Sequence, residues 1–425
     1  MPQQLVITGG QALNGEIKIS GAKNSALKLM CAALLTEEPV TLTNIPALRD
    51  VDTLCSLFEF MGATCKRDGS TLTIQAKTLG VRAPYELVSK MRASVLVLGP
   101  LMARFGRAEV AMPGGCAIGD RPLDITQHGF ERLGAKFIFE HGMMWVKNKL
   151  KGAHIHLRLP SVGATENLML AATMAEGTTV IDNAACEPEI ADLANLLNAM
   201  GAKVKGAGTS KIEIEGVTRL HGATQAVMPD RIESGSYLIA ALLAGGEKGV
   251  TIRNSPNFAM QAFFEVIRSS GAVFNEVDES TLFVPHQDRH FTAVDVLTDY
   301  YPGFATDLQA QTMIFATQCN GISKVYEKIY ENRLMHAAEL RNMNAKIEVV
   351  NPQLALVHGQ AKLSGAHVRC TDLRGGMAVV LAGLVAKGYT TVHDIQHLDR
   401  GYEKLEQKLS ALGAKIERVE SEAAA

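Results

Sequence analysis

A chain of 425 residues is longer than one hydrophobic core supports, because single cores stop growing at ~250–300 residues, so we expect at least two cores. With 47% apolar and 20% charged residues, the composition is typical of a globular α/β protein and excludes a long disordered arm. A net charge of −2 argues against a nucleic-acid-binding surface, which requires a clustered basic face.

The seven cysteines form no Cys-x-x-Cys pair, which argues against a zinc site and a disulfide framework and fits a reducing compartment. The first residues lack the basic and then apolar pattern of a signal peptide. The longest apolar runs, 93–103 and 375–386, are shorter than the ~20 residues that span a bilayer. We therefore expect a cytoplasmic protein.

A repeat of about 70 residues runs through the chain. A short signature of an apolar residue, a glycine and an alanine ends a helical pattern near positions 62, 134, 201, 271, 344 and 413, with asparagine in place of glycine at 344 and serine as the first residue at 270. The intervals between these positions are 72, 67, 70, 73 and 69 residues, too regular for chance. The sequence therefore predicts six copies of one structural unit.

Each copy begins with an amphipathic helix, and the glycine that follows suits the left-handed conformation that ends helices. A hairpin pattern comes next, for example over 63–74 with its turn at Asp68 and Gly69, or over 135–146. A second helix in each copy is apolar on every side, so we expect it inside the domain with the sheets outside. These second helices are predicted over 25–35, 94–103, 167–175, 236–244, 309–316 and 377–385.

The phase of the repeat predicts the domains. The sixth copy stops at 415–419 with half a hairpin, whereas the chain begins with a strand pattern over 5–8, so the N-terminus should supply the missing strand. Two α/β lobes of three copies each follow: 22–229, and 1–21 with 230–425.

One loop between the helices and strands carries reactive groups. The segment 112–122 holds three glycines and two prolines, which exclude regular structure, and it contains Cys116 and Arg121. A thiol near backbone N–H groups and a fixed positive charge tends towards a lowered pKa and acid or nucleophile chemistry. The alternative is a surface turn with an incidental cysteine.

Polar residues recur in the segment before each apolar helix, where helix N-termini favour anions. For Ser161, Asp230 and Asp372 the simpler interpretation is a helix cap. For Lys23, Arg92 and Arg374 we favour contact with an anionic ligand, because a buried cation without an anion is costly. The other residues of this group are Asn24, Gly163, Arg231 and Asp307, and further polar groups lie at Glu331-Asn-Arg333 before a helix and at Arg400-Gly-Tyr402, which opens the last helix.

Taken together, these motifs resemble the UDP-N-acetylglucosamine 1-carboxyvinyltransferases of the enolpyruvyl transferase family, over essentially the whole chain. The resemblance implies two inside-out α/β barrels of three repeated units each. The motifs that carry it are Ser20-Gly-Ala-Lys-Asn24, Met91-Arg-Ala-Ser94, Pro113-Gly-Gly-Cys-Ala-Ile-Gly119, Arg121-Pro122, Ser161-Val-Gly-Ala-Thr165, Pro229-Asp-Arg-Ile-Glu233, Thr306-Asp-Leu-Gln-Ala-Gln311, Glu331-Asn-Arg333 and Asp399-Arg-Gly-Tyr402.

The reaction implied by the resemblance transfers the enolpyruvyl group of phosphoenolpyruvate to the 3-hydroxyl of UDP-N-acetylglucosamine and releases phosphate, with no metal or organic cofactor. This reaction opens peptidoglycan precursor synthesis. The resemblance also implies that fosfomycin and similar epoxides alkylate Cys116. Cys116 would be the acid and could add covalently to phosphoenolpyruvate, and Asp307 would be the base. Lys23, Arg121 and Arg400 would hold the phosphate, Arg333 and Arg374 the carboxylate, Asn24, Arg92 and Ile329 the sugar, and Arg121, Pro122, Leu123, Asp124, Ile125, Ser161, Val162 and Gly163 the uridine diphosphate.

Two positions depart from the family pattern. Leu159 stands where some relatives have lysine, and Asp120 stands where a small neutral residue is common. The alternatives to this function are transfer to shikimate 3-phosphate, a catalytically silent nucleotide-sugar sensor, and an RNA-end cyclase of related fold. The cysteine loop argues against the first, the presence of Cys116, Asp307 and Lys23 against the second, and the near-neutral charge against the third.

Overall fold

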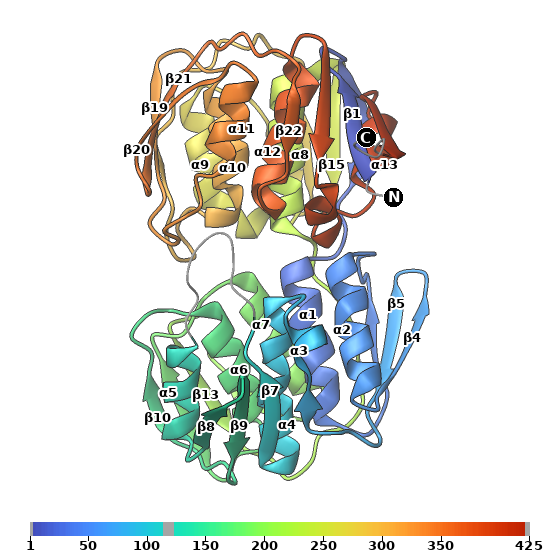
Figure 1. Ribbon diagram of the computed structural model, residues 1–425, viewed down its shortest axis with the longest axis vertical. Helices are drawn as coiled ribbons and strands as arrows, with labels where there is room; N and C mark the ends of the chain where they lie inside the picture. The colour runs from blue at the N-terminus through green and yellow to red at the C-terminus, as the bar shows by residue number, and fades with distance from the viewer. Residues whose placement is uncertain (1–2, 114–122, 421–425) are drawn as a thin grey trace. The chain divides into compact units, whose positions relative to one another are not determined.

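The computed structural model describes residues 3–113 and 123–420, which fold into two compact units (Figure 1). The first lobe comprises residues 21–113 and 123–228, and the second lobe comprises 3–20 and 229–420. We keep the lobes drawn from the repeat, 22–229 and 1–21 with 230–425, as a proposal for the domains of the chain. No helix of the described residues is long and apolar enough to cross a membrane.

The first lobe contains three copies of the repeat. Its elements are α1 (Lys23–Ala32), η1 (Ala33–Leu35), β3 (Val40–Thr43), α2 (Arg49–Phe60), β4 (Thr64–Asp68), β5 (Thr71–Gln75), β6 (Arg82–Ala83), α3 (Tyr85–Val88), η2 (Arg92–Val97), α4 (Leu98–Phe105), β7 (Arg107–Ala111), α5 (Asp124–Arg132), β8 (Lys136–Glu140), β9 (Met143–Lys147), β10 (His154–His156), α6 (Val162–Ala172), β11 (Thr178–Asp182), α7 (Pro188–Ala199), β12 (Lys203–Lys205), β13 (Lys211–Glu215) and β14 (Thr224–Ala226).

The second lobe contains the other three copies. Its elements are β1 (Gln3–Thr8), β2 (Leu13–Lys18), α8 (Arg231–Ala244), β15 (Gly245–Arg253), η3 (Asn257–Ala259), α9 (Gln261–Ser269), β16 (Asn275–Asp278), β17 (Thr281–Val284), β18 (Val296–Leu297), η4 (Thr306–Leu308), α10 (Gln309–Ala316), β19 (Ile322–Tyr326), α11 (His336–Asn342), β20 (Lys346–Asn351), β21 (Leu354–His358), β22 (His367–Arg369), α12 (Leu373–Val385), β23 (Tyr389–His393), η5 (Ile395–Arg400), α13 (Leu405–Ala411) and β24 (Lys415–Glu420).

The described strands form six sheets of four strands with one shared pattern, in which one neighbouring pair is parallel and the next two are antiparallel. The orders in the first lobe are β14-β3-β5-β4, β6-β7-β9-β8 and β10-β11-β13-β12. Those in the second lobe are β16-β17-β15-β2, β18-β19-β21-β20 and β22-β23-β1-β24. The six predicted copies, three in each lobe, are confirmed.

The last sheet is completed by the start of the chain. Leu5 of β1 lies opposite Val392 of β23 on one side and Arg418 of β24 on the other, both in antiparallel register. This pairing confirms the expectation that the N-terminus supplies the strand missing from the sixth copy.

The second helix of every copy lies in the interior. Every residue of α8 is buried, as are all eight residues of α10, and α8, α10 and α12 pack against one another. Figure 1 shows these helices in the middle of the second lobe with strands outside them. Because most side chains of these helices are apolar, enclosing the helices behind the sheets removes a large apolar surface from water. Each lobe has its own buried core, so the inside-out α/β barrel fold is confirmed.

The repeat signature ends each amphipathic helix with a left-handed residue. At the end of α2, Gly62 has φ 101°, its N–H donates to the Glu59 carbonyl at 3.0 Å, and the Ala63 N–H donates to the Phe58 carbonyl at 2.9 Å. These two bonds define a Schellman motif. Asn344 takes the same place with φ 69°, which asparagine tolerates better than other side chains. The predicted role of the glycine is confirmed.

The buried helices begin two to five residues earlier than predicted in most copies. The helix α8 begins at Arg231 instead of 236, and α6 begins at Val162 instead of 167. Capping explains the difference, because Asp230 accepts from the N–H groups of Ile232 and Glu233 at 2.8 and 3.1 Å. Several predicted binding residues therefore lie in the first helical turn and not in a preceding loop.

Candidate active site

Three predicted site residues of the second lobe meet in one ionic cluster. Asp307 lies in η4, Arg333 precedes α11, and Arg374 lies in the first turn of α12. Asp307 Oδ1 accepts from Arg333 Nη2 at 2.6 Å, while its Oδ2 accepts from Arg374 Nη2 at 2.8 Å and Nε at 3.2 Å. Both oxygens of one carboxylate thus hold a guanidinium each.

The cluster is buried enough for these charges to act strongly on one another. The side chains of Arg333 and Arg374 are 5% and 4% exposed, and that of Asp307 is 25% exposed. Burial disfavours the charged carboxylate, but the guanidinium groups of Arg374 and Arg333 outweigh it and hold the pKa of Asp307 well below its usual range. Burial likewise opposes the charge on both arginines, and Asp307 overcomes it and raises their pKa values. Asp307 is therefore an anion here, and a weak base while both arginines hold it.

The arginines also have unused donor capacity. Arg374 Nη1 is buried and has no hydrogen-bond partner among the described residues. A buried donor without an acceptor is costly, by about 1–3 kcal/mol. An anion or a water molecule that accepts from this nitrogen would remove that cost, so the cluster is suited to a small carboxylate or phosphate.

The remaining predicted residues of the second lobe lie on nearby elements. Arg400 is the last residue of η5, which packs against α12, and not the opening residue of the last helix, which begins at Leu405. The helix starts later because Lys404 has a left-handed backbone with φ 49°. Ile329 lies in the loop after β19, and its N–H donates to Glu327 Oε1 at 2.9 Å.

In the first lobe, Lys23 and Asn24 form the start of α1. Lys23 Nζ lies 2.7 Å from Oδ2 of Asp50 in α2, and these side chains are 12% and 3% exposed. The argument that Lys23 needs a ligand as its anion is therefore wrong, because Asp50 supplies one. The same correction applies to Arg374, whose anion is Asp307.

The other predicted contacts of the first lobe lie on elements that touch one another. Arg92 begins η2, which packs against both α1 and α6. Ser161 caps α6 by accepting from the Ala164 N–H at 3.4 Å, which confirms the cap, and Val162 and Gly163 follow in the first turn. The helix α5, with Leu123 as its N-cap and Asp124 and Ile125 in its first turn, packs against α6.

Of the two positions that depart from the family pattern, Leu159 lies within the described residues and Asp120 does not. Leu159 is 41% exposed. Asp120 lies outside the described residues, as do the predicted site residues Cys116, Arg121 and Pro122.

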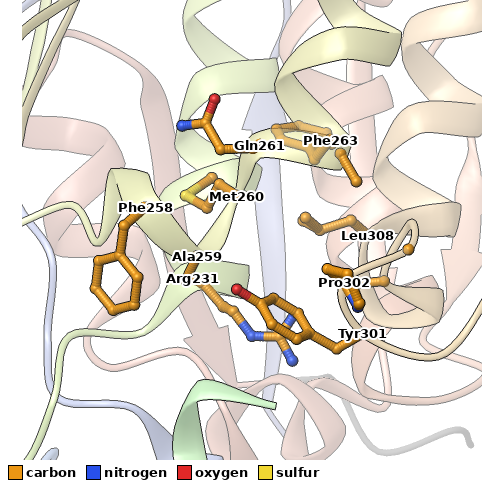
Figure 2. A pocket seen from close by; sticks show the side chains of 12 residues that line it. Arg231, Phe258, Ala259, Met260, Gln261, Phe263, Tyr301, Pro302 and Leu308 are labelled. Carbon is orange, nitrogen blue, oxygen red and sulfur yellow. The ribbon is translucent and has the colours of Figure 1, made fainter. Parts of the chain in front are cut away.

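The second lobe contains a small cavity (Figure 2). It has a volume of about 140 Å³, and its wall includes Ala305 and Leu308, which flank the turn that carries Asp307. The guanidinium of Arg231 lies 5.7 Å from the centre of the Tyr301 ring at one side of it. Of these wall residues, Arg231 and Leu308 lie in motifs that the sequence analysis names, whereas Ala305 and Tyr301 do not.

Sequence reasoning missed several residues that hold the site together. Asp50 binds Lys23, and Thr306 Oγ1 accepts from Arg333 Nη1 at 2.8 Å. Glu327 accepts from Thr306 Oγ1 at 2.7 Å. A signal existed for Glu327, since an acidic residue that directly continues the buried alternation of a strand requires internal hydrogen bonds. Within 3–113 and 123–420, no group of three or more histidine, cysteine, aspartate or glutamate side chains is arranged to hold a metal ion.

Comparison with known proteins agrees with the fold. Residues 7–409 match the family described as EPSP synthase (3-phosphoshikimate 1-carboxyvinyltransferase). The UDP-N-acetylglucosamine 1-carboxyvinyltransferase 1 of Caldanaerobacter subterraneus subsp. tengcongensis is 48% identical over 98% of this chain and 100% of its own length. The UDP-N-acetylglucosamine 1-carboxyvinyltransferase of Caulobacter vibrioides is 49% identical over 99% and 98%.

Solved structures show the same fold at lower sequence identity. The enolpyruvyl transferase NikO from Streptomyces tendae has a TM-score of 0.89 at 24% identity, covering 98% of this chain and 99% of its own. EPSP synthase from Acinetobacter baumannii has a TM-score of 0.77 at 19% identity, covering 98% and 100%. On its matched residues and its full-length relatives, the chain belongs to the enolpyruvyl transferases, and within them it is similar along its whole length to UDP-N-acetylglucosamine 1-carboxyvinyltransferases.

Proposed function

We propose that this chain transfers the enolpyruvyl group of phosphoenolpyruvate to the 3-hydroxyl of UDP-N-acetylglucosamine and releases phosphate. The observation that carries the proposal is the buried cluster of Asp307, Arg333 and Arg374, which joins a carboxylate base to two cations in a chain of this family. The relatives at 48–49% identity, named for this reaction, support UDP-N-acetylglucosamine as the acceptor over shikimate 3-phosphate.

The cluster suits an anionic substrate by exchange of partners. The carboxylate of phosphoenolpyruvate would accept hydrogen bonds from Arg333 and Arg374, including the Arg374 Nη1 donor that has no partner within residues 3–113 and 123–420. As the arginines turn to the substrate, the pKa of Asp307 rises from its lowered value and the carboxylate becomes able to accept a proton. Substrate binding thereby activates the base.

The reaction would then run by addition and elimination. Asp307 takes the proton of the 3-hydroxyl, whose oxygen bonds to carbon 2 of phosphoenolpyruvate while Cys116 gives a proton to carbon 3. The Cys116 thiolate then takes a proton back from carbon 3, the bond between carbon 2 and the phosphate oxygen breaks, and the proton held by Asp307 passes to the leaving phosphate, which yields the enol ether and phosphate. Arginine and lysine charges stabilise the leaving phosphate without a metal.

The division of binding roles also remains a proposal. Lys23, Arg121 and Arg400 hold the phosphate, and Asn24, Arg92 and Ile329 line the sugar. The uridine diphosphate is held by Arg121, Pro122, Leu123, Asp124, Ile125, Ser161, Val162 and Gly163. Because the cysteine usage of the chain fits a reducing compartment, we propose that the enzyme is cytoplasmic.

The test is phosphate release from phosphoenolpyruvate with different acceptors. We expect turnover with UDP-N-acetylglucosamine and none with shikimate 3-phosphate or with no acceptor. Turnover with shikimate 3-phosphate alone would assign the chain to the other transferase, and binding of the nucleotide sugar without turnover would make it a sensor.

A further inference from the structure

Glu327 is a buried carboxylate with a complete set of neutral hydrogen-bond donors. It directly follows β19 in the second lobe and is 0% exposed. Its oxygens accept from two threonine hydroxyls and two backbone N–H groups. A carboxylate buried in this way is stable only while these donors stay in place, so each of them is held in return.

One oxygen of Glu327 holds the loop that carries Ile329. Oε1 accepts from the N–H of Ile329 at 2.9 Å, from the N–H of Tyr330 at 3.2 Å and from Thr298 Oγ1 at 3.0 Å. Thr298 Oγ1 in turn accepts from the Lys328 N–H at 2.8 Å. These bonds fix the backbone of the loop at three successive residues.

The other oxygen acts on the ionic cluster through one hydroxyl. Thr306 Oγ1 donates to Glu327 Oε2 at 2.7 Å and accepts from Arg333 Nη1 at 2.8 Å. A hydroxyl has a single proton, so donating it to Glu327 leaves the oxygen free to accept from the guanidinium. Glu327 thus sets the direction of a chain of hydrogen bonds that ends at Asp307, which accepts from Arg333 Nη2.

We propose that Glu327 is a positioning residue that couples the Ile329 loop to the Arg333–Asp307 pair, so that one buried carboxylate aligns the sugar contact and the carboxylate contact together. The proposal rests on the proposed function for the identity of the two substrates. It does not depend on that function for the hydrogen-bond chain itself, which the structure contains.

The polarity of the chain makes a specific prediction for Glu327→Gln. The glutamine has one acceptor oxygen for the donors that Glu327 satisfies, and its amide would donate to Thr306 Oγ1. The hydroxyl proton would then point at Arg333 Nη1, which places two donors face to face. Thr306→Val removes the hydroxyl while keeping the shape, and Thr306→Ser keeps the hydroxyl.

The test compares KM and kcat of these variants with those of the parent enzyme, together with calorimetric binding of each substrate. For Thr306→Val we expect the KM for phosphoenolpyruvate to rise roughly ten- to hundredfold, the range for losing a hydrogen bond to a charged group, with the KM for UDP-N-acetylglucosamine within about threefold of the parent. Thr306→Ser should restore the parent value. Glu327→Gln should raise both KM values. The double variant with Glu327→Gln and Thr306→Val should bind phosphoenolpyruvate no worse than whichever of these two single variants has the lower affinity for it.

The matched control is Thr312→Val, which removes a buried hydroxyl that donates to the Leu308 carbonyl at 2.8 Å. This hydroxyl is not part of the hydrogen-bond chain from Glu327 to Asp307. It should leave both KM values unchanged. Equal KM values in the Thr306→Val variant and the parent, failure of Thr306→Ser to restore binding, or additive losses in the double variant would overturn the role of Glu327. If Glu327→Gln does not fold, the comparison of Thr306→Val with Thr306→Ser still tests the hydrogen-bond chain. A parent enzyme that binds both substrates but releases no phosphate would refute the proposed function and leave the binding comparison intact.

Discussion

Asp307→Asn is the substitution whose effect follows most directly from the ionic cluster. The change keeps the shape of the side chain but removes its charge and replaces one acceptor oxygen with a donor. Oδ1 and Oδ2 lie 2.6 and 2.8 Å from nitrogens of Arg333 and Arg374. The amide would therefore face one guanidinium with its own donors, and two buried cations would lose their counter-ion.

The loss of stability can be estimated from the burial of the cluster. Removing one partner of a buried ion pair costs about 3–5 kcal/mol, and because the Asp307 side chain is 25% exposed we take the lower end, ~3 kcal/mol. For a unit of roughly 200 residues that corresponds to a fall in Tm of about 6–12 °C. The assay is thermal unfolding of parent and variant at neutral pH without substrates.

The difference between the two proteins should depend on pH. The folded-state pKa of Asp307 is lowered, so its contribution to the free energy of unfolding is present above the unfolded-state value of ~3.9 and is lost as the pH falls towards the folded-state value. The gap in Tm should therefore be constant from neutral pH to about pH 5 and shrink below about pH 4.

Catalysis separates the two roles of Asp307. Loss of a general base typically costs about 10²–10⁴-fold in turnover. Phosphoenolpyruvate should still bind to the variant, since its carboxylate no longer competes with Asp307 for the two arginines. The matched control is Asp299→Asn, which removes an exposed pair with Lys328 (2.8 Å) that is worth less than ~1 kcal/mol. A Tm loss equal to that of the control, or turnover within a few-fold of the parent, would refute the reasoning.

Three further outcomes follow from the sequence and from contacts and backbone angles within each lobe. Fosfomycin should form one covalent adduct, located by peptide mass spectrometry on the peptide that carries Cys116. If the enzyme is inactivated with the adduct on another cysteine, Cys116 is not the acid. Asp50→Asn should lower the free energy of unfolding by ~3 kcal/mol, because Lys23 loses its buried anion, and denaturant unfolding with an unchanged midpoint would contradict this. Gly271→Ala should cost about 1–2 kcal/mol since φ is 88°. Asn344→Gly should cost less, because it relieves the left-handed backbone and loses only one exposed hydrogen bond, from Asn344 Nδ2 to the Lys362 carbonyl at 2.9 Å. Equal effects on Tm would be contrary to the capping argument.

The repeat could be predicted from the sequence because its signals are local. Helical periodicity, the glycine at the end of each amphipathic helix and the hairpin turns each involve residues a few positions apart. Even the completion of the last sheet by β1 followed from counting strands in each copy.

What could not be predicted depends on tertiary contacts. The partner of Lys23 is Asp50, 27 positions along the chain on another helix, and the partner of Arg374 is Asp307, 67 positions away. An argument from burial alone assigned both cations to a ligand. The helix starts were placed too late because the apolar pattern begins after the cap, and Asp230 shows that the cap decides where a helix begins. Glu327 was missed since its importance lies in its four donors, which come from three separate segments.

The central claim is tested most directly by following the carbon atoms of the donor. Phosphoenolpyruvate labelled with ¹³C at carbon 2 would be incubated with the enzyme and UDP-N-acetylglucosamine and observed by NMR. We predict that the label appears in an enol ether attached to the nucleotide sugar, with one phosphate released for each ether formed. Phosphate release with the label in free pyruvate, or a label that transfers only to shikimate 3-phosphate, would contradict the account.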